Sequence, residues 1–184
     1  MKTKMLISVL FFLPLLQIVS AQKIITKTGH IWFYSHTPME DIEAHNRQVV
    51  SSLDCSTGDL QFLLLIKSFE FKRTLMQEHF NEEYMESDKL PKASFKGKIT
   101  NLSQINFKKD GTYPAQVTGD LTIHGVTKNV TTNGTVEVKG SAISANAQFM
   151  VVPQDYGIKI PSLVENKIAK EMTVHVEMSY SLNQ

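Results

Sequence analysis

The sequence predicts an all-β protein, a closed antiparallel barrel of about eight strands with one amphipathic helix between strands four and five. Alternation of apolar and polar residues carries this prediction, most clearly at 172–182, where every second residue from Met172 to Leu182 is apolar. Successive side chains of a strand point to opposite faces, so the alternation indicates one dry and one wet face. A large antiparallel sheet must close or pair with another sheet to hide its edges. A barrel of about eight strands has room inside for side chains or one small ligand.

The amino-terminal half shows strand patterns separated by turn signals. Residues 28–35 are rich in aromatic and β-branched side chains, which favour a strand. A short strand at 39–46 is expected to end in a bend at Asn46-Arg47, and another strand follows at 48–54. The cluster Ser-Thr-Gly-Asp at 56–59 is typical of a turn.

The next two segments differ in their hydrophobic period. Residues 60–69 are nearly continuously apolar, which predicts a strand buried on both faces. Between 71 and 85 the apolar residues Met76, Phe80 and Tyr84 recur every four positions. This spacing predicts the amphipathic helix.

The carboxy-terminal half returns to the period of a strand. His124-Gly125 predicts a tight hairpin turn, and Asn133-Gly134 predicts a bulge or a break within a strand. The expected elements are strands at 93–105, 112–123, 126–138 and 142–152, a loop at 153–161, a helical turn at 164–170 and the final strand at 172–182.

The first 21 residues have the pattern of a signal peptide. Lys2 and Lys4 precede a short apolar run, and the small residues of Val19-Ser20-Ala21 predict cleavage after Ala21. The run is interrupted by Pro14 and is shorter than the roughly 20 residues of a membrane span. We therefore expect residues 22–184 to form one domain without a transmembrane anchor, either periplasmic or secreted.

Charge and cysteine content argue against a nucleic-acid-binding protein and exclude a protein held together by internal disulfides. The chain has 19 Lys and Arg and 18 Asp and Glu, and two of the lysines lie in the signal peptide. Nucleic-acid binding depends on clustered positive charge, so no nucleic-acid partner is expected. Cys55 is the one cysteine, which excludes an internal disulfide. Its simplest role is that of a small hydrophobic side chain near a strand end.

Three ordered blocks of the chain carry a resemblance to a known family. They are Phe-Asn-Glu-Glu-Tyr-Met-Glu-Ser-Asp-Lys-Leu-Pro-Lys-Ala-Ser-Phe at 80–95, Gly-Asp-Leu-Thr-Ile-His-Gly-Val-Thr-Lys-Asn-Val at 119–130, and Asp-Tyr-Gly-Ile at 155–158 ahead of the final strand. Together they resemble the YceI-like family of exported, lipocalin-like barrels. The resemblance implies an apolar lumen that holds a long isoprenoid or other lipid chain, in a protein typically exported to a bacterial periplasm. One stretch departs from the family pattern: Lys72-Arg73-Thr74-Leu75 stands where the family often carries an Arg-Asp-His-Leu-type stretch.

The apolar positions of the strands supply the candidate lumen residues. The small side chains of Ala145 and Ala147 leave room that a packed core would normally fill. The same apolar positions would also fill a small barrel without a ligand, and the resemblance favours the ligand. The candidate lipid-binding residues are Ile31, Phe33, Phe62, Leu64, Phe95, Ile99, Leu121, Ile123, Ala147, Phe149, Val174 and Val176.

Metal and enzyme chemistry find little support in the sequence. The six histidines show no spacing typical of a metal site, and no Gly-x-Ser-x-Gly elbow occurs. The expected function is non-enzymatic and needs no cofactor: a monomer or homodimer sequesters or carries an isoprenoid or fatty chain. One alternative is a filled-core, stress-linked or structural barrel that binds a protein. Another is an enzyme that acts on a lipid head group through a polar residue near the mouth, such as His36 or Asp155.

Overall fold

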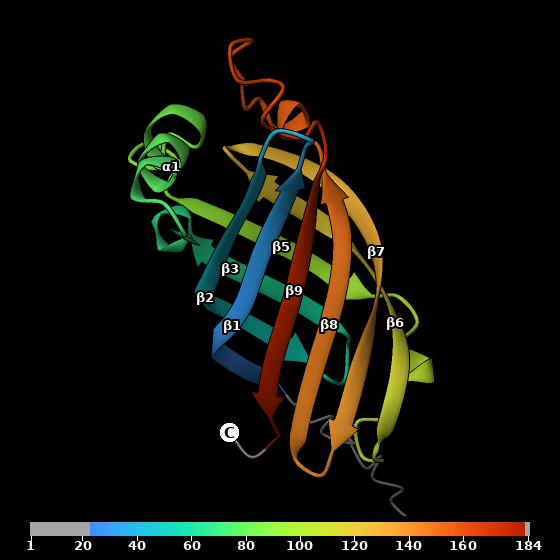
Figure 1. Ribbon diagram of the computed structural model, residues 1–184. Coiled ribbons are helices and arrows are strands. Elements are labelled where there is room, and N and C mark those ends of the chain that lie inside the picture. Colours follow the sequence, from blue (N-terminus) through green and yellow to red (C-terminus); the bar gives the residue numbers. More distant parts are fainter. Residues whose placement is uncertain (1–22, 183–184) are drawn as a thin grey trace, which may run out of the picture.

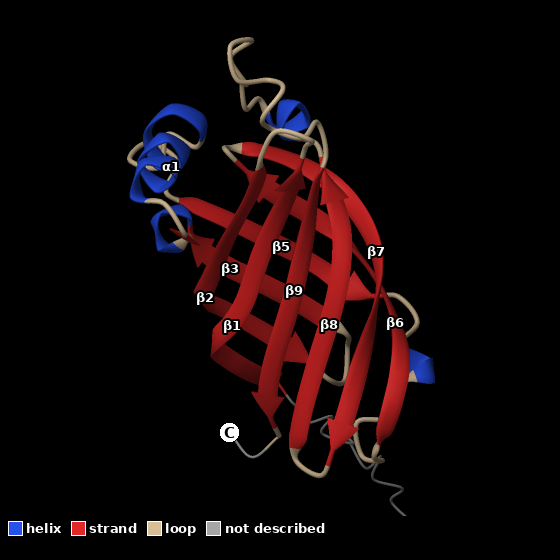
Figure 2. Ribbon diagram, in the orientation of Figure 1, coloured by secondary structure: helices blue, strands red, loops and turns tan. Residues whose placement is uncertain are grey.

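The computed structural model describes residues 23–182, which form one antiparallel sheet with short helical segments (Figures 1 and 2). The signal peptide expected at 1–21 lies outside the described residues. The strands are β1 (Lys23–His36), β2 (Asp41–Asp54), β3 (Asp59–Leu65), β4 (Glu70–Phe71), β5 (Lys92–Ile99), β6 (Gly111–Ile123), β7 (Val126–Lys139), β8 (Ala142–Val151) and β9 (Met172–Ser181). The helical segments are α1 (Thr74–His79), the π-helix η2 (Phe80–Tyr84), and the 3-10 turns η1 (Ile66–Ser68), η3 (Leu102–Gln104) and η4 (Pro153–Tyr156).

The sheet closes into an eight-stranded antiparallel barrel, as the alternation predicted. Neighbouring strands follow the order β1-β9-β8-β7-β6-β5-β3-β2, and β2 pairs back onto β1. The two-residue strand β4 is an additional strand that pairs with β2. Within the described residues, no helix has the length and apolar character needed to cross a membrane.

The helix lies between β4 and β5, where the four-residue period placed it. It is shorter than the expected 71–85, because Phe71 pairs with Ala44 in the sheet and the helical turns begin at Thr74. The helical turn expected at 164–170 is replaced by turns that begin and end about three residues earlier. Residues 161–167 form successive hydrogen-bonded turns, since the amides of Val164 and Lys167 each bond to a carbonyl three residues earlier.

The strand expected at 60–69 is shorter than predicted and is buried on one face only. Leu60 and Leu64 are buried, whereas Leu63 is 41 % exposed and Leu65 is 49 % exposed. The barrel wall is a single layer, so an outward side chain of β3 meets solvent even when it is leucine. The chain then leaves the sheet in η1.

The bend expected at Asn46-Arg47 does not break β2. Gly29 of β1 pairs with Val49 of β2, and Ile31 pairs with Asn46. The partners on β2 are therefore one residue further apart than the two residues on β1. A β-bulge of this kind absorbs an extra residue inside a continuous strand.

The two turn signals around β7 have different outcomes. His124-Gly125 forms the expected tight hairpin, with φ values of 51° and 76° that fit a type I′ turn. Gly134 neither bulges nor breaks β7, whose register with β6 is constant along its whole length. A Cβ at Gly134 would lie 2.4 Å from the Asn146 carbonyl oxygen, so glycine here permits close packing of β7 on β8.

Two seams of the barrel are unpaired toward one end, while the β1–β9 seam is unpaired toward the other, because its ladder stops at His30–Glu177. The ladder between β2 and β3 runs from Leu53–Leu60 to Val50–Leu63 and stops. The ladder between β7 and β8 stops at Gly134–Ala147. Both ladders stop toward the same end, which carries the β1–β2 hairpin, α1 and the segment 152–171 (Figure 1). We call this the hollow end and the opposite end the packed end.

Single side chains bridge the two seams where the ladders are missing. The Asn46 amide donates to the Leu65 carbonyl at 2.9 Å across the β2–β3 seam. The Thr132 hydroxyl donates to the Gln148 carbonyl at 3.0 Å across the β7–β8 seam. Each seam is therefore bridged by a side-chain hydrogen bond beyond the point where its ladder stops.

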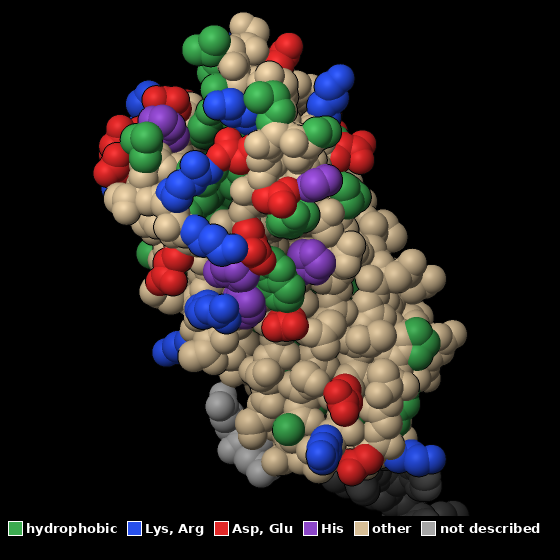
Figure 3. Space-filling model, viewed as in Figure 1, with side chains coloured by type: hydrophobic (Ala, Val, Ile, Leu, Met, Phe, Trp, Pro, Cys, Tyr) green, Lys and Arg blue, Asp and Glu red, His purple; other side chains and the backbone are tan. Residues whose placement is uncertain are grey.

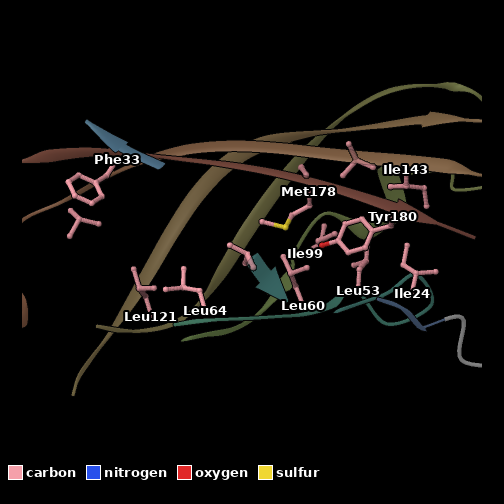
Figure 4. Close-up of a cluster of buried hydrophobic side chains, with 14 of the residues drawn as sticks. Ile24, Phe33, Leu53, Leu60, Leu64, Ile99, Leu121, Ile143, Met178 and Tyr180 are labelled. Carbon is pink, nitrogen blue, oxygen red and sulfur yellow. The ribbon is translucent and has the colours of Figure 1, made fainter. Parts of the chain in front are cut away.

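The packed end holds most of the fully buried side chains. Ile24, Leu53, Ile143 and Met178 are each 1 % exposed. Figure 4 shows Ile24, Leu53, Ile143 and Tyr180 grouped at this end, with Phe33, Leu64 and Leu121 lying apart from them. The Tyr180 and Ser51 hydroxyls share a buried hydrogen bond at 2.6 Å. This end therefore closes the interior as an ordinary core does.

Candidate functional site

The hollow end encloses the larger of two cavities, which we call the upper cavity. Its volume is about 470 Å³, within the range of about 300–1,000 Å³ typical of small-molecule sites. Its barrel wall includes Phe33 of β1, Leu121 of β6, Phe149 of β8 and Val174 of β9. The side chains of these strands leave this volume open between them.

A smaller cavity of about 130 Å³, the lower cavity, continues toward the packed end. The residues that line both cavities are Ile31, Leu64, Ala93, Leu121 and Phe149. The two cavities therefore adjoin along the barrel, with these five side chains at the boundary between them, and we call the two together the lumen. Along β9 the lining runs from Met172 at the mouth to Tyr180 at the packed end, a rise of about 27 Å for strand geometry.

The interior of the lumen is almost wholly apolar. At the lower cavity the Thr132 hydroxyl is already engaged by the Gln148 carbonyl. At the upper cavity, burial and the nearby Glu83 raise the pKa of Tyr84, so its phenol stays neutral. An apolar ligand would therefore meet no charged group deep in the lumen, while the charged lining residues Glu40, Arg73 and Lys167 belong to the mouth.

The helical segments cover part of the mouth. Phe80 packs on a cluster of aromatic rings, with centroids 5.7 Å from Phe33, 5.7 Å from Phe69 and 4.9 Å from Phe71. Arg73 and Glu40 form an ion pair between the start of α1 and the β1–β2 hairpin. These contacts hold α1 and η2 over the upper cavity.

The segment between β8 and β9 covers the other part of the mouth. It contributes Ile158, Ile160, Val164 and Ile168 to the lining. The Ala169 amide donates to the buried Ser35 hydroxyl at 2.8 Å, which ties this segment to β1. Leu163 at its tip is 88 % exposed.

All twelve residues proposed from the sequence lie on the lumen wall. The upper cavity is lined by Ile31, Phe33, Leu64, Leu121, Ile123, Phe149 and Val174, and the lower cavity adds Phe62, Phe95, Ile99, Ala147 and Val176. Their role in lipid binding stays a prediction. The geometry shows that these residues, which lie on one face of each strand, point toward a shared interior.

Sequence reasoning missed the lining residues outside the regular strands. Met76, Phe80 and Tyr84 of the helical segments reach the upper cavity, and their four-residue period was visible without indicating what the helix covers. Ile158 and Ile168 lie in an irregular segment. No local periodicity could have placed them on the lumen.

The histidines form an outward ring stack instead of a metal site. Trp32 stacks on His175 with centroids 4.7 Å apart and on His30 at 4.5 Å. His30 Nε2 and His45 Nδ1 are 3.0 Å apart, and burial followed by the Arg47 charge lowers the pKa of His30. Figure 3 shows histidines among acidic and basic side chains on this face. Within residues 23–182, no group of three or more His, Cys, Asp or Glu side chains is placed to hold a metal ion.

The polar residues considered for other chemistry lie away from the lumen lining. His36 pairs with Asp41 at 2.5 Å on the surface, and Asp155 lies 3.7 Å from Lys128. Neither lines a cavity among the described residues. Burial and the adjacent Asp54 charge raise the pKa of Cys55 to about 11, so its thiol is protonated and a poor nucleophile.

Solved structures share this architecture. A polyisoprenoid-binding domain from Saccharophagus degradans, implicated in plant cell wall breakdown, has a TM-score of 0.76 at 14 % identity over 88 % of this chain and 98 % of that domain. BcnA of Burkholderia cenocepacia has a TM-score of 0.69 at 16 % identity over 82 % of this chain and 95 % of that one. The YceI protein of Campylobacter jejuni has a TM-score of 0.53 at 17 % identity over 98 % of both chains. At these identities the likeness shows the fold.

A sequence match identifies the family. No curated protein matches the chain, whereas the YceI-like domain matches residues 22–180, which is most of its length. The match spans every strand of the barrel and both walls of the lumen. This protein belongs to the YceI-like family.

Proposed function

We propose that this protein binds one long apolar chain along its lumen and sequesters or carries it without chemical change. The observation that carries the proposal is that two apolar cavities adjoin along the barrel and share the lining residues Ile31, Leu64, Ala93, Leu121 and Phe149. A ligand that enters at the mouth extends along β9 toward Tyr180. A long, narrow and uncharged space of this kind fits a hydrocarbon chain better than a compact polar molecule.

The energetics of burial favour such a ligand. Apolar surface removed from water contributes about 25 cal/mol per Å². A chain that buries roughly 300 Å² would therefore gain about 7 kcal/mol before the costs of association. The empty upper cavity lowers those costs, because no core side chain has to move out of the way.

An isoprenoid is the class of chain that we favour, with a fatty chain as the second. The S. degradans domain of the same fold is a polyisoprenoid-binding domain. We further propose that residues 1–21 direct export and that the mature domain acts as a monomer or homodimer in a periplasm or outside the cell.

Native mass spectrometry of the protein purified from its own source, followed by organic extraction, tests the proposal. An added mass that extracts as an isoprenoid or fatty chain is the expected result. An unchanged mass after incubation with membrane lipids would contradict carriage and favour a barrel that acts through its outer surface.

A matched pair of variants on β8 tests the lumen itself. Phe149 lines both cavities, and its neighbour Met150 points outward and is 51 % exposed. Phe149→Asp should lower retention of the chain by about tenfold or more, because a carboxylate in an apolar channel is costly to desolvate. Met150→Asp should retain the chain as the wild type does, as measured by the same mass spectrometry.

Ala147→Phe gives an independent test if Phe149→Asp folds poorly. The larger ring would occupy the lower cavity of about 130 Å³ and shorten the chain that fits. Equal chain lengths bound to the wild type and to a folded Ala147→Phe protein would contradict the proposed path of the ligand.

A further inference from the structure

Three large apolar side chains at the hollow end are exposed to solvent to an unusual degree. Eight large apolar side chains of residues 23–182 are exposed, and five of them, between 39 % and 51 % exposed, lie on the barrel strands. The other three are Met39 at 60 %, Leu75 at 61 % and Leu163 at 88 %. Single exposed apolar side chains are common on protein surfaces. These three are the most exposed of the set, and all of them lie at one end of the barrel.

The backbone presents each of these side chains to solvent from an ordered position. Met39 lies in the turn that joins β1 to β2, and Leu75 is the second residue of α1. Leu163 is the third residue of a turn in which the Val164 amide donates to the Pro161 carbonyl at 3.0 Å. Turns favour glycine, proline and small polar residues. The turns at 39 and 163 therefore give no reason of their own for a methionine or a leucine.

Each exposed side chain lies next to the lining of the upper cavity. Leu75 itself lines that cavity and is also exposed, so it marks the place where the cavity opens to solvent. Met39 precedes the lining residue Glu40, and Leu163 precedes the lining residue Val164. We call Met39, Leu75 and Leu163 the rim. They bring three segments that are distant in sequence to one mouth (Figure 1).

The charged side chains beside Leu163 are compatible with a lipid surface. Residues 159–171 carry Lys159, Lys167 and Lys170 together with Glu165 and Glu171, and within the described part of the chain none of these five forms an ion pair. Figure 3 shows apolar side chains among charged ones at this end. Long charged side chains lay their stems along apolar surface and keep their ends in water. They can therefore remain among lipid head groups when the apolar tip enters a bilayer.

The form of the rim favours a bilayer over a protein partner. A stable protein interface has a closely packed apolar core inside a polar rim. Here three separate apolar tips stand around an opening, and a fluid bilayer adapts to such tips where a rigid protein surface does not. The chain that the lumen is proposed to hold is also soluble in a bilayer and not in water. A mouth that faces a bilayer gives this chain a dry path.

We propose that Met39, Leu75 and Leu163 dock the mouth of the barrel onto a phospholipid bilayer. The rim enters the head-group region, the upper cavity opens toward the acyl chains, and an apolar chain passes between bilayer and lumen without crossing water. The inference rests on the proposed function only for this transfer. Docking itself is a property of the empty protein.

Flotation of the empty protein with vesicles of phosphatidylethanolamine and phosphatidylglycerol tests the docking. The wild type should float with the vesicles. Met39→Gln and Leu163→Gln should each weaken the partition by roughly three- to tenfold, because an interfacial side chain leaves water only in part. The double variant should weaken it by about tenfold or more. Both side chains are exposed, so the variants should fold as the wild type does, which circular dichroism checks.

Leu63→Gln is the matched control for the vesicle experiment. Leu63 is an exposed leucine on the outer wall of β3, away from the rim, so this variant should float as the wild type does. Equal flotation of the wild type and the folded double variant would overturn the docking, as would a wild type that stays in solution. A dimer that dissociates in the double variant, measured by sedimentation equilibrium without vesicles, would instead assign the rim to a second copy of this chain.

Uptake of labelled geranylgeraniol from the same vesicles tests the transfer. The double variant Met39→Gln/Leu163→Gln should take up the label about tenfold more slowly than the wild type. It should retain preloaded label in solution as well as the wild type does, because neither residue lines a cavity of the described chain. Equal uptake rates would overturn the role of docking in transfer. A wild type that never retains the label would contradict the proposed function, while flotation of the empty protein still decides the docking.

Discussion

The packed end and the hollow end of the barrel are made from the same strands with the same alternation, yet only one of them is filled. On β8, Ile143 at the packed end is 1 % exposed and touches the core, whereas Phe149 on the same face borders both cavities. Strand pairing also differs between the two ends. The β2–β3 and β7–β8 ladders stop toward the hollow end, whereas the β1–β9 ladder stops toward the packed end at His30–Glu177. The same alternation therefore fills one end of the barrel and borders a cavity at the other.

Truncation of one aliphatic side chain at each end should break this comparison most severely. Ile143 at the packed end is 1 % exposed and lines neither cavity, whereas Leu64 borders both cavities. We expect Ile143→Ala to lower the free energy of unfolding by about 3–5 kcal/mol, because it opens a new cavity in a filled core. Leu64→Ala should cost about 1–3 kcal/mol less, because its side chain already borders empty space. Urea denaturation measures both, and equal losses would mean that the two ends are equally well packed.

An alkaline titration sharpens the description of the packed end. Burial raises the pKa of Tyr180 to about 12 from its ordinary value of 10, although the Ser51 hydrogen bond works the other way. The raised pKa means that the unfolded chain releases this proton first, so stability is complete below about pH 10 and falls as the pH rises toward about 12. The loss should amount to about 2–3 kcal/mol.

Tyr180→Phe should remove this alkaline loss, as measured by the free energy of unfolding across the same pH range. Tyr113→Phe is the control and should keep it, because Tyr113 is only half-buried and its hydroxyl donates to the Lys109 carbonyl. An unchanged alkaline profile in Tyr180→Phe would contradict a closed, water-free packed end.

The smallest expected effects concern the side chains that bridge the seams. Asn46 is fully buried, donates to the Leu65 carbonyl and accepts from the Gln48 amide. Asn46→Ala should cost about 1–3 kcal/mol, because it leaves buried main-chain groups unpaired. Thr132→Val on the other seam should cost about 1 kcal/mol or less, because it removes one solvent-exposed hydrogen bond. Thermal unfolding measures the stability of both variants. A larger loss of stability in Thr132→Val than in Asn46→Ala would mean that the β7–β8 seam, and not the β2–β3 seam, depends more on its side-chain hydrogen bond.

Much of the lumen wall was predictable because the face of a strand is a local property. Phe62, Ile99, Ala147 and Val176 lie on the lumen as their alternation predicted. The hairpin at His124-Gly125 was predictable for a similar reason, since a two-residue turn depends on its own backbone preferences. The same local reasoning wrongly predicted a bulge or break at Gly134. Glycine at this position allows β7 and β8 to pack closely, which the sequence of one strand cannot show.

By itself the sequence determined the β class, the inward parity of each strand, the single amphipathic helix and the family resemblance. These follow from the two-residue period of a strand and the 3.6-residue period of a helix, which neighbouring residues carry. Only the tertiary structure decided where the ladders stop and where the lumen lies in the barrel. It also decided that Ile158 and Ile168 complete the mouth. Register and close approach are relations between distant segments, so they depend on how all the strands pack together.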